Sequence, residues 1–380
     1  MPTTPLAEFQ AYFAEIEDPR VERTRRHELL DIIVIAICAV ICSADDWVDV
    51  EGWGNAKLDW LRQHGLPLPN GIPSHDTFGD VFGRLKPDQF ETSFLGWVQT
   101  VMGASGGKIV AIDGKTLRRS HDRRLGKSAI HMVSAWASAN HLLLGQVKVD
   151  EKSNEITAIP ALLAMLTLGG AIVTMDAMGT QTEIARAIID QGADYVLAIK
   201  ENQGHLYEDV VATFQEAAAR QFEHVPHTYA KTTNKGHGRV EIRESWVIER
   251  LDYIEALRTA ENWAELHSLI MIRAERRLAE QVSVEWRYFI SSLADPAERM
   301  LAIIRSHWGV ENELHWCLDV AFGEDASRIR KGDGAQNFSF LRRLALTLLK
   351  RETTAKMGLK AKRHQAGWDN DYLLRVLAAT

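Results

Sequence analysis

The pattern of apolar and polar positions divides the chain into a helical N-terminal part and a longer part of alternating strands and helices. Residues 26–43 form a largely apolar stretch, and over residues 46–63 apolar residues recur with a period close to 3.6, which is typical of helices. Ser74 precedes a third such stretch and Pro87 begins a fourth, as a capping serine and a first-turn proline favour. We therefore expect residues 1–103 to form an all-helical domain.

From residue 108 onward, short apolar runs bounded by turn residues indicate strands. The expected strands cover residues 108–113, 130–139, 142–149, 171–176 and 195–200, and the expected helices cover 156–166, 180–191 and 203–220. The first three strands would be antiparallel, and right-handed crossovers would add the next two in parallel. This order predicts a mixed five-stranded α/β sheet with helices over residues 104–220, the first part of an α/β core.

A second block of strands interrupts this order. It comprises residues 228–232, 240–249, 268–273 and 282–293, and helices are expected over 296–320, 336–350 and 369–379. We interpret residues 221–293 as an inserted β subdomain. Residues 294–380 would then complete the core with helices and supply a basic C-terminal segment.

Composition is that of a globular protein with a sizeable core, since 46% of residues are hydrophobic and 25% are charged. The longest apolar run, residues 32–42, is shorter than the roughly 20 residues that span a bilayer. The first residues lack the features of a signal peptide. Three cysteines are too few for a disulfide framework and suggest a reducing compartment. We expect a cytoplasmic protein.

Charge is segregated along the chain. The formal net charge is −7, yet residues 328–363 hold 11 lysines and arginines against two acidic residues. A net negative total therefore does not exclude a polyanionic partner.

Three carboxylates stand where a two-metal enzyme needs them. Asp113 and Asp176 each end an apolar strand-like run, and Glu311 lies in a helical stretch far downstream. If the two strands pair in parallel, the aspartates meet at one edge of the sheet, and close like charges call for a divalent cation. Oxygen-only ligands suit Mg²⁺ or Mn²⁺. Taken singly, each acid is more simply explained as a turn cap or a solvated side chain, and the weight comes from their order and surroundings.

Several motifs stand in a fixed order along the chain: Ala-Ile-Asp113-Gly-Lys-Thr-Leu-Arg-Arg-Ser120, Glu151-Lys-Ser-Asn-Glu-Ile156, Asp176-Ala-Met-Gly-Thr-Gln181, Lys235-Gly-His-Gly-Arg239 and His307-Trp-Gly-Val-Glu-Asn312. Together they resemble one family, the H-repeat-associated, ISAs-type branch of bacterial insertion-sequence transposases. Residues 46–54 and 70–78 are similar to the helical associated domain of that branch. The likeness covers about residues 6–375.

The resemblance implies a ribonuclease H-like core with a DDE triad at Asp113, Asp176 and Glu311. It implies that the triad holds two Mg²⁺ ions, for which Mn²⁺ can substitute, and that the protein performs cut-and-paste transposition. The expected partners are transposon terminal inverted repeats and target DNA, bound by a homodimer, so that the protein would associate with the nucleoid.

One departure concerns the surroundings of the glutamate. The wider superfamily often has Tyr-x2-Arg-x3-Glu-x6-Lys, and this chain has Ile304, His307, Glu311 and Leu318 at those positions. His307 could replace the arginine as a phosphate contact only in its protonated form. Arg330 and Lys331 are candidates to replace the lysine.

Further residues are predicted to contact DNA because cations near the strand ends suit a phosphate backbone. They are Lys115, Arg118, Arg119, Lys200, His237, Arg239, His307, Asn312, Arg330, Lys331, Arg342 and Arg343. Trp246 and His237 in the insertion are candidates to contact a distorted base, although Trp246 is better explained as part of a small core.

Two other functions remain open at this stage. A DNA-binding remnant that no longer cuts would keep the same motifs and act as a repressor or an inert relic. A metal-dependent phosphoesterase for small molecules would use the same carboxylates, but the basic segment and the large insertion disfavour it.

Overall fold

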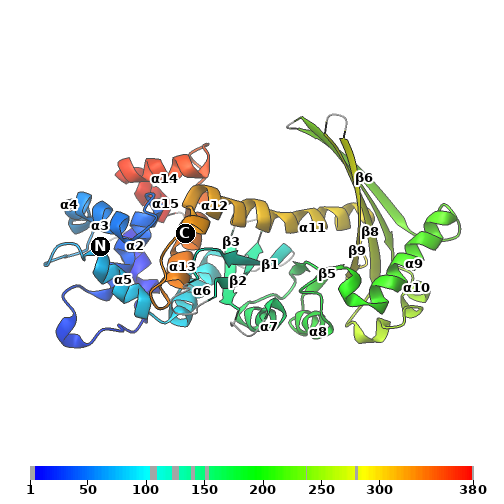
Figure 1. The fold of residues 1–380 in the computed structure, drawn as a ribbon, viewed down its shortest axis with the longest axis horizontal. Helices are drawn as coiled ribbons and strands as arrows, with labels where there is room; N and C mark the ends of the chain where they lie inside the picture. The colour runs from blue at the N-terminus through cyan, green and yellow to red at the C-terminus, as the bar shows by residue number, and fades with distance from the viewer. Residues whose placement is uncertain are drawn as a thin grey trace.

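A computed structural model describes residues 5–102, 109–121, 128–137, 142–149, 154–236, 238–278 and 281–378 (Figure 1). Nine strands among these residues form one mixed, mostly antiparallel sheet in the order β3-β2-β1-β4-β5-β9-β8-β7-β6. Helices cover both faces of the sheet, and a separate group of helices lies at one end of the molecule. No helix in the described ranges is long and apolar enough to cross a membrane.

The first five strands have the directions that the sequence predicts. They are β1 (Ile109–Leu117), β2 (Ile130–Ala137), β3 (Leu142–Lys148), β4 (Ile172–Met175) and β5 (Asp194–Ile199). β1, β2 and β3 are antiparallel, and β4 lies parallel to both β1 and β5. The crossover helices α7 (Glu155–Met165) and α8 (Thr182–Asp190) lie below the sheet in the view of Figure 1.

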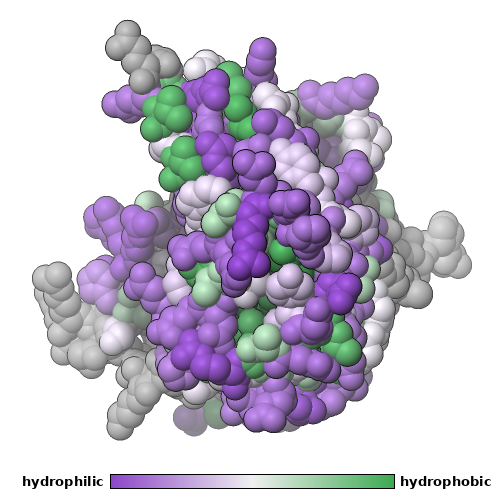
Figure 2. All heavy atoms as spheres, turned by 90° about the vertical axis from the view of Figure 1, so that its right-hand side faces the viewer, coloured by the Kyte–Doolittle hydropathy of each residue, from purple (hydrophilic) through white to green (hydrophobic). Residues whose placement is uncertain are grey.

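The expected five-stranded limit of the sheet is corrected by the structure. The inserted strands are β6 (Thr228–Gly236), β7 (Arg239–Ile248), β8 (Ser268–Leu278) and β9 (Gln281–Ser291). β9 pairs antiparallel with β5 from Val196↔Ser291 to Ile199↔Tyr288, so the insertion continues the same sheet. Beyond this pairing the four strands project as an arm (residues 228–248 and 268–291), and α9 (His205–Ala219) and α10 (Leu251–Glu255) flank its base (Figure 1). Figure 2 views the molecule from this end, with apolar surface gathered near the tip of the arm; Val282 and Val284, near the start of β9, are exposed.

The N-terminal helices form the expected helical group, in which α2 (Leu29–Ile41) is almost entirely buried. The other members are α1 (Pro5–Tyr12), η1 (Glu22–Thr24), α3 (Trp47–Ala56), α4 (Leu58–Gln63), α5 (His75–Arg84) and α6 (Pro87–Met102). Ser74 caps α5 by accepting a hydrogen bond from the Thr77 amide, as predicted. The single helix expected over residues 46–63 is interrupted at Lys57, the boundary of α3 and α4.

The C-terminal helices divide between the sheet and the helical group. α11 (Ala297–Gly309) crosses one face of the sheet and leads into the π-helix η5 (Val310–His315), α12 (Trp316–Phe322) and η6 (Glu324–Ala326). α13 (Gly334–Arg351) packs against α2, α5 and α6, and α14 (Leu359–Trp368) and α15 (Asn370–Leu377) join it. Short 3-10 turns at η3 (Glu201–Gln203) and η4 (Ala260–Asn262) complete the described elements.

Candidate active site

Strand pairing brings the first two carboxylates together. β1 and β4 pair in parallel up to Ile112↔Met175, so Asp113 and Asp176 are the next residues on adjacent strands. The expectation that Asp113 ends its strand is wrong, because β1 continues to Leu117 and pairs with β2 alone beyond this point. Only β4 ends here, and that leaves an open edge beside Asp113. The two aspartates are therefore neighbours, as predicted, at a step in the sheet.

Glu311 is brought to the same edge by the helical segment that crosses the sheet. α11 packs across β1 and β4, and η5 contacts β1. Asp113, Asp176 and Glu311 line one cavity of about 320 Å³ together with residues of α11 and β9. The π-helical turn widens the helix by one residue at the acidic position, and such turns are frequent at functional sites.

The charge in this cavity is not balanced. Burial, together with the nearby carboxylates of Asp176, Glu155 and Glu311, raises the pKa of Asp113 to about 7, although a hydrogen bond from the Gly114 amide acts in the opposite direction. A carboxyl group surrounded by carboxylates is the environment that a bound divalent cation would relieve. The donor set therefore fits Mg²⁺ or Mn²⁺. The acidic and imidazole groups of the described residues nevertheless do not form a ready cluster of three or more metal ligands.

His307 lies in the cavity but does not carry the charge that the sequence interpretation required. Its Nδ1 is hydrogen-bonded to Thr174 Oγ1 at 3.0 Å. Burial lowers its pKa below the ordinary value of 6.5, although Asp176 acts in the opposite direction. At neutral pH the ring is therefore neutral. A role as a cationic substitute for arginine is not supported.

Cations from the end of β5 and from the arm line the cavity. Lys200 at the end of β5 and Arg287 on β9 line it, and the Arg287 guanidinium lies 4.5 Å from the ring centre of Trp308. Strand alternation and pairing place four arginines on this face of the arm, namely Arg239, Arg243, Arg276 and Arg287. Glu241 and Glu285 pair with three of them, which leaves a net positive face. Arg239 was predicted from the sequence; His237 lies outside the described residues.

Trp246 lies on the opposite face of the arm. It pairs with Met271, which pairs with Tyr288, while the cavity is lined by Glu285, Arg287 and Phe289 of the alternate register. Trp246 stacks on Phe222, with ring centres 6.0 Å apart. Its position favours the interpretation as part of a small core over contact with a base at the carboxylates.

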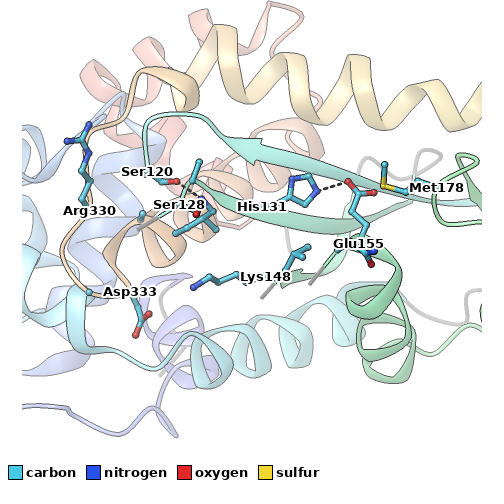
Figure 3. Close-up of a pocket in the computed structure, with 14 residues that line it drawn as sticks. Ser120, Ser128, His131, Lys148, Glu155, Met178, Arg330 and Asp333 are labelled. Carbon is cyan, nitrogen blue, oxygen red and sulfur yellow. Dashed lines mark hydrogen bonds and ion pairs between the residues drawn. The ribbon is translucent and has the colours of Figure 1, made fainter. Parts of the chain in front are cut away.

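His131 and Glu155 form a polar pair beside β1, next to Gly114 (Figure 3). His131 Nε2 and Glu155 Oε1 are 2.6 Å apart, and His131 Nδ1 is hydrogen-bonded to Thr116 Oγ1 at 2.8 Å. A Cβ at Gly114 would collide with the side-chain ends of both Glu155 and His131, so a larger residue after Asp113 would displace this pair. The pair borders a second cavity of about 350 Å³ that Lys148 and Arg330 also line. The motif around Glu155 was noted in the sequence, but its place beside Asp113 required the fold.

Some of the residues predicted to contact phosphate are exposed, and others are already paired with groups of the protein. Arg118, Arg119, Asn312, Arg330 and Lys331 are exposed. Arg330 donates to the Arg119 carbonyl, and Lys331 pairs with Asp80 of α5 at 3.0 Å. Lys115 is nearly buried and pairs with Asp319 and Glu324.

The expectation that Arg342 and Arg343 form a DNA-binding face is wrong. They are 2% and 0% exposed, because α13 is the central helix of the helical group. Arg343 pairs with buried Glu324 at 2.7 Å, and Arg342 donates to the Asp45 carbonyl. Lys362 and Arg363 are buried as well. Four of the 11 cations in residues 328–363 are therefore internal, whereas Arg328, Arg330, Lys331, Lys356 and Lys360 remain exposed.

Comparison with known proteins agrees with this architecture. Residues 10–98 match the family model described as DDE_Tnp_1-associated, and residues 104–348 match the Transposase DDE domain. The chain is 39% identical to "H repeat-associated putative transposase YhhI" of Escherichia coli K12 over 99% of both chains. It is 40% identical to "Putative transposase YncI" of Escherichia coli O157:H7 over 97% of this chain and 94% of that one. A shorter relative, "Inactive transposase YbfQ" of Escherichia coli K12, is 47% identical over 16% of this chain and 70% of its own length.

Proposed function

Because the chain belongs to the DDE transposase family, we propose that it is an active transposase that moves an insertion sequence by cut-and-paste. Water attacks the phosphodiester at the element end, and the freed 3′-hydroxyl then attacks target DNA. The observation that carries the proposal is the convergence of Asp113, Asp176 and Glu311, from three distant segments, on one cavity. A ribonuclease H-like core is the fold that the family implies.

The three carboxylates would hold two Mg²⁺ or Mn²⁺ ions, which when bound activate the attacking hydroxyl and stabilise the leaving oxygen. The cations of the chain bind and orient the DNA. Lys200 and Arg287 at the cavity would hold phosphates next to the scissile bond, and the arginine face of the arm would follow the backbone outward. His307, held neutral by burial, would contribute its shape and hydrogen-bonding capacity, with its ring fixed by Thr174.

We also propose that a homodimer at the nucleoid holds the two element ends, and that the domain boundaries expected from the sequence describe the functional parts.

The experiment is Mg²⁺-dependent cleavage of labelled duplexes that carry the DNA flanking the gene. Asp113→Asn, Asp176→Asn and Glu311→Gln should each abolish cleavage, because each removes a ligand charge with little change of shape, and should leave end binding intact. Asp190→Asn, an exposed carboxylate at the end of α8, is the matched control.

Cleavage by any triad variant at the wild-type rate would remove that residue from the site. A wild-type protein that binds the ends in Mg²⁺ and never cuts them would instead identify an inert DNA-binding remnant.

A further inference from the structure

Lys115 connects β1, the strand of Asp113, to the helical segment that carries Glu311. It lies on β1 two residues after Asp113, so the two side chains share a face of the strand. Its ammonium lies 2.6 Å from Asp319 Oδ1 of α12 and 3.0 Å from Glu324 Oε2 of η6. It also donates to the His315 carbonyl at 3.3 Å, at the last residue of the π-helix that carries Glu311.

The partners of Lys115 are themselves fixed. Glu324 is 2% exposed, pairs with Arg343 at 2.7 Å and accepts a hydrogen bond from Ser339 at 2.9 Å, both on α13. His315 is buried with Nδ1 3.5 Å from Asp113 Oδ2. The network thus extends from the strand of Asp113 through η6 to the central helix of the helical group.

We propose that Lys115 is a positioning residue that sets the distance between the Asp113 strand and the Glu311 helix, rather than a contact for DNA phosphate. This inference rests on the proposed function and deepens it. Its side chain is only 10% exposed and already has two carboxylates and a carbonyl as partners. A phosphate would have to displace buried ion pairs, which costs more than a surface contact returns. Without Lys115, Asp319 and Glu324 would repel one another, and the helix that carries Glu311 would lose one of its polar contacts with β1.

The test compares Lys115→Met with Lys362→Met. Lys362 is a matched control because it is also nearly buried, pairs with Glu352 at 3.5 Å and donates to the Leu349 carbonyl, far from the carboxylates in the fold. Both variants should lose stability. Only Lys115→Met should weaken Mn²⁺ binding to the DNA-free protein, measured by titration calorimetry, by about 10–100-fold, as loss of an outer partner of a metal ligand does. Its cleavage rate at saturating Mg²⁺ should fall by about 10²-fold.

Asp319→Asn provides a second, less buried variant in case Lys115→Met does not fold. It should also weaken Mn²⁺ binding, and the effects of the two changes in one protein should be less than additive. Equal Mn²⁺ affinity in Lys115→Met, Lys362→Met and wild type, or full additivity in the double variant, would overturn the positioning role.

DNA binding separates this role from the earlier expectation. The slope of log affinity against log salt, from fluorescence anisotropy of a labelled duplex, should be the same in Lys115→Met and wild type. A slope flatter by about one unit would identify a phosphate contact and overturn the proposal. Failure of the wild type to cleave at all would refute the proposed function instead, while the Mn²⁺ titration would still test Lys115.

Discussion

Asp113→Asn should stabilise the metal-free protein while abolishing its activity. The Asp113 carboxyl is protonated more readily in the folded chain than in the unfolded one, because burial and the neighbouring carboxylates raise its pKa from 3.8 to about 7. Asparagine has nearly the shape of the protonated acid and never ionises. The variant therefore removes the free energy that the fold spends on holding a buried negative charge.

The magnitude follows from the pKa difference. A difference of about three units corresponds to about 4 kcal/mol at 1.36 kcal/mol per unit, which is an upper limit because the side chain is 28% exposed. We expect roughly 1–3 kcal/mol at pH 8. The group binds more protons in the folded state, so its favourable contribution is complete below pH 3.8 and decreases as the pH rises, until it is lost above about pH 7. The advantage of the variant should accordingly be smaller at pH 5 than at pH 8.

The assay is thermal unfolding in EDTA at pH 5 and pH 8. At about 1.3 °C per kcal/mol for a chain of 380 residues, Asp113→Asn should melt roughly 1–4 °C above wild type at pH 8, and Asp190→Asn should change the melting temperature little. Mg²⁺ should stabilise the wild type at pH 8 and have little effect on Asp113→Asn. A variant that is less stable than wild type at pH 8 in EDTA would refute the reasoning, because it would show that the Asp113 carboxylate is favourably held without metal.

Three further predictions concern the framework. Gly332→Ala should cost at least about 2 kcal/mol of stability, because Gly332 has φ +53° and its added Cβ would collide with the Gly83 carbonyl. Denaturant unfolding should show this loss. Gly358→Ala, which has open space around its Cβ, should change stability little. Arg343→Gln should destabilise by about 3–5 kcal/mol, since it leaves buried Glu324 without its main partner, and should not change the salt slope of DNA binding per folded molecule. Trp246→Ala should lower the melting temperature and spare cleavage per folded molecule. An unchanged melting temperature together with a loss of cleavage would instead show that Trp246 contacts DNA.

Local sequence patterns determined the elements that need only short-range information. The apolar runs that end at Asp113 and Asp176 predicted two adjacent parallel strands, because the pleat and the handedness of crossovers leave few alternatives. Ser74 and Pro87 marked the helix starts for the same reason, since capping depends on residues within one turn. The motif resemblance identified the family that the comparisons confirm.

Tertiary packing alone decided the environment of each charge. A run of basic residues looks the same in sequence whether it faces solvent or fills a core, and the partners that bury Arg343 and Lys115 lie in other elements. Contacts between distant residues likewise decide three other features. These are the pairing of β9 with β5, the π-helical turn at Glu311 and the packing of the Glu155 side chain against Gly114. Periodicity records which positions are apolar, whereas the free energy of a buried charge depends on which opposite charge the fold places beside it.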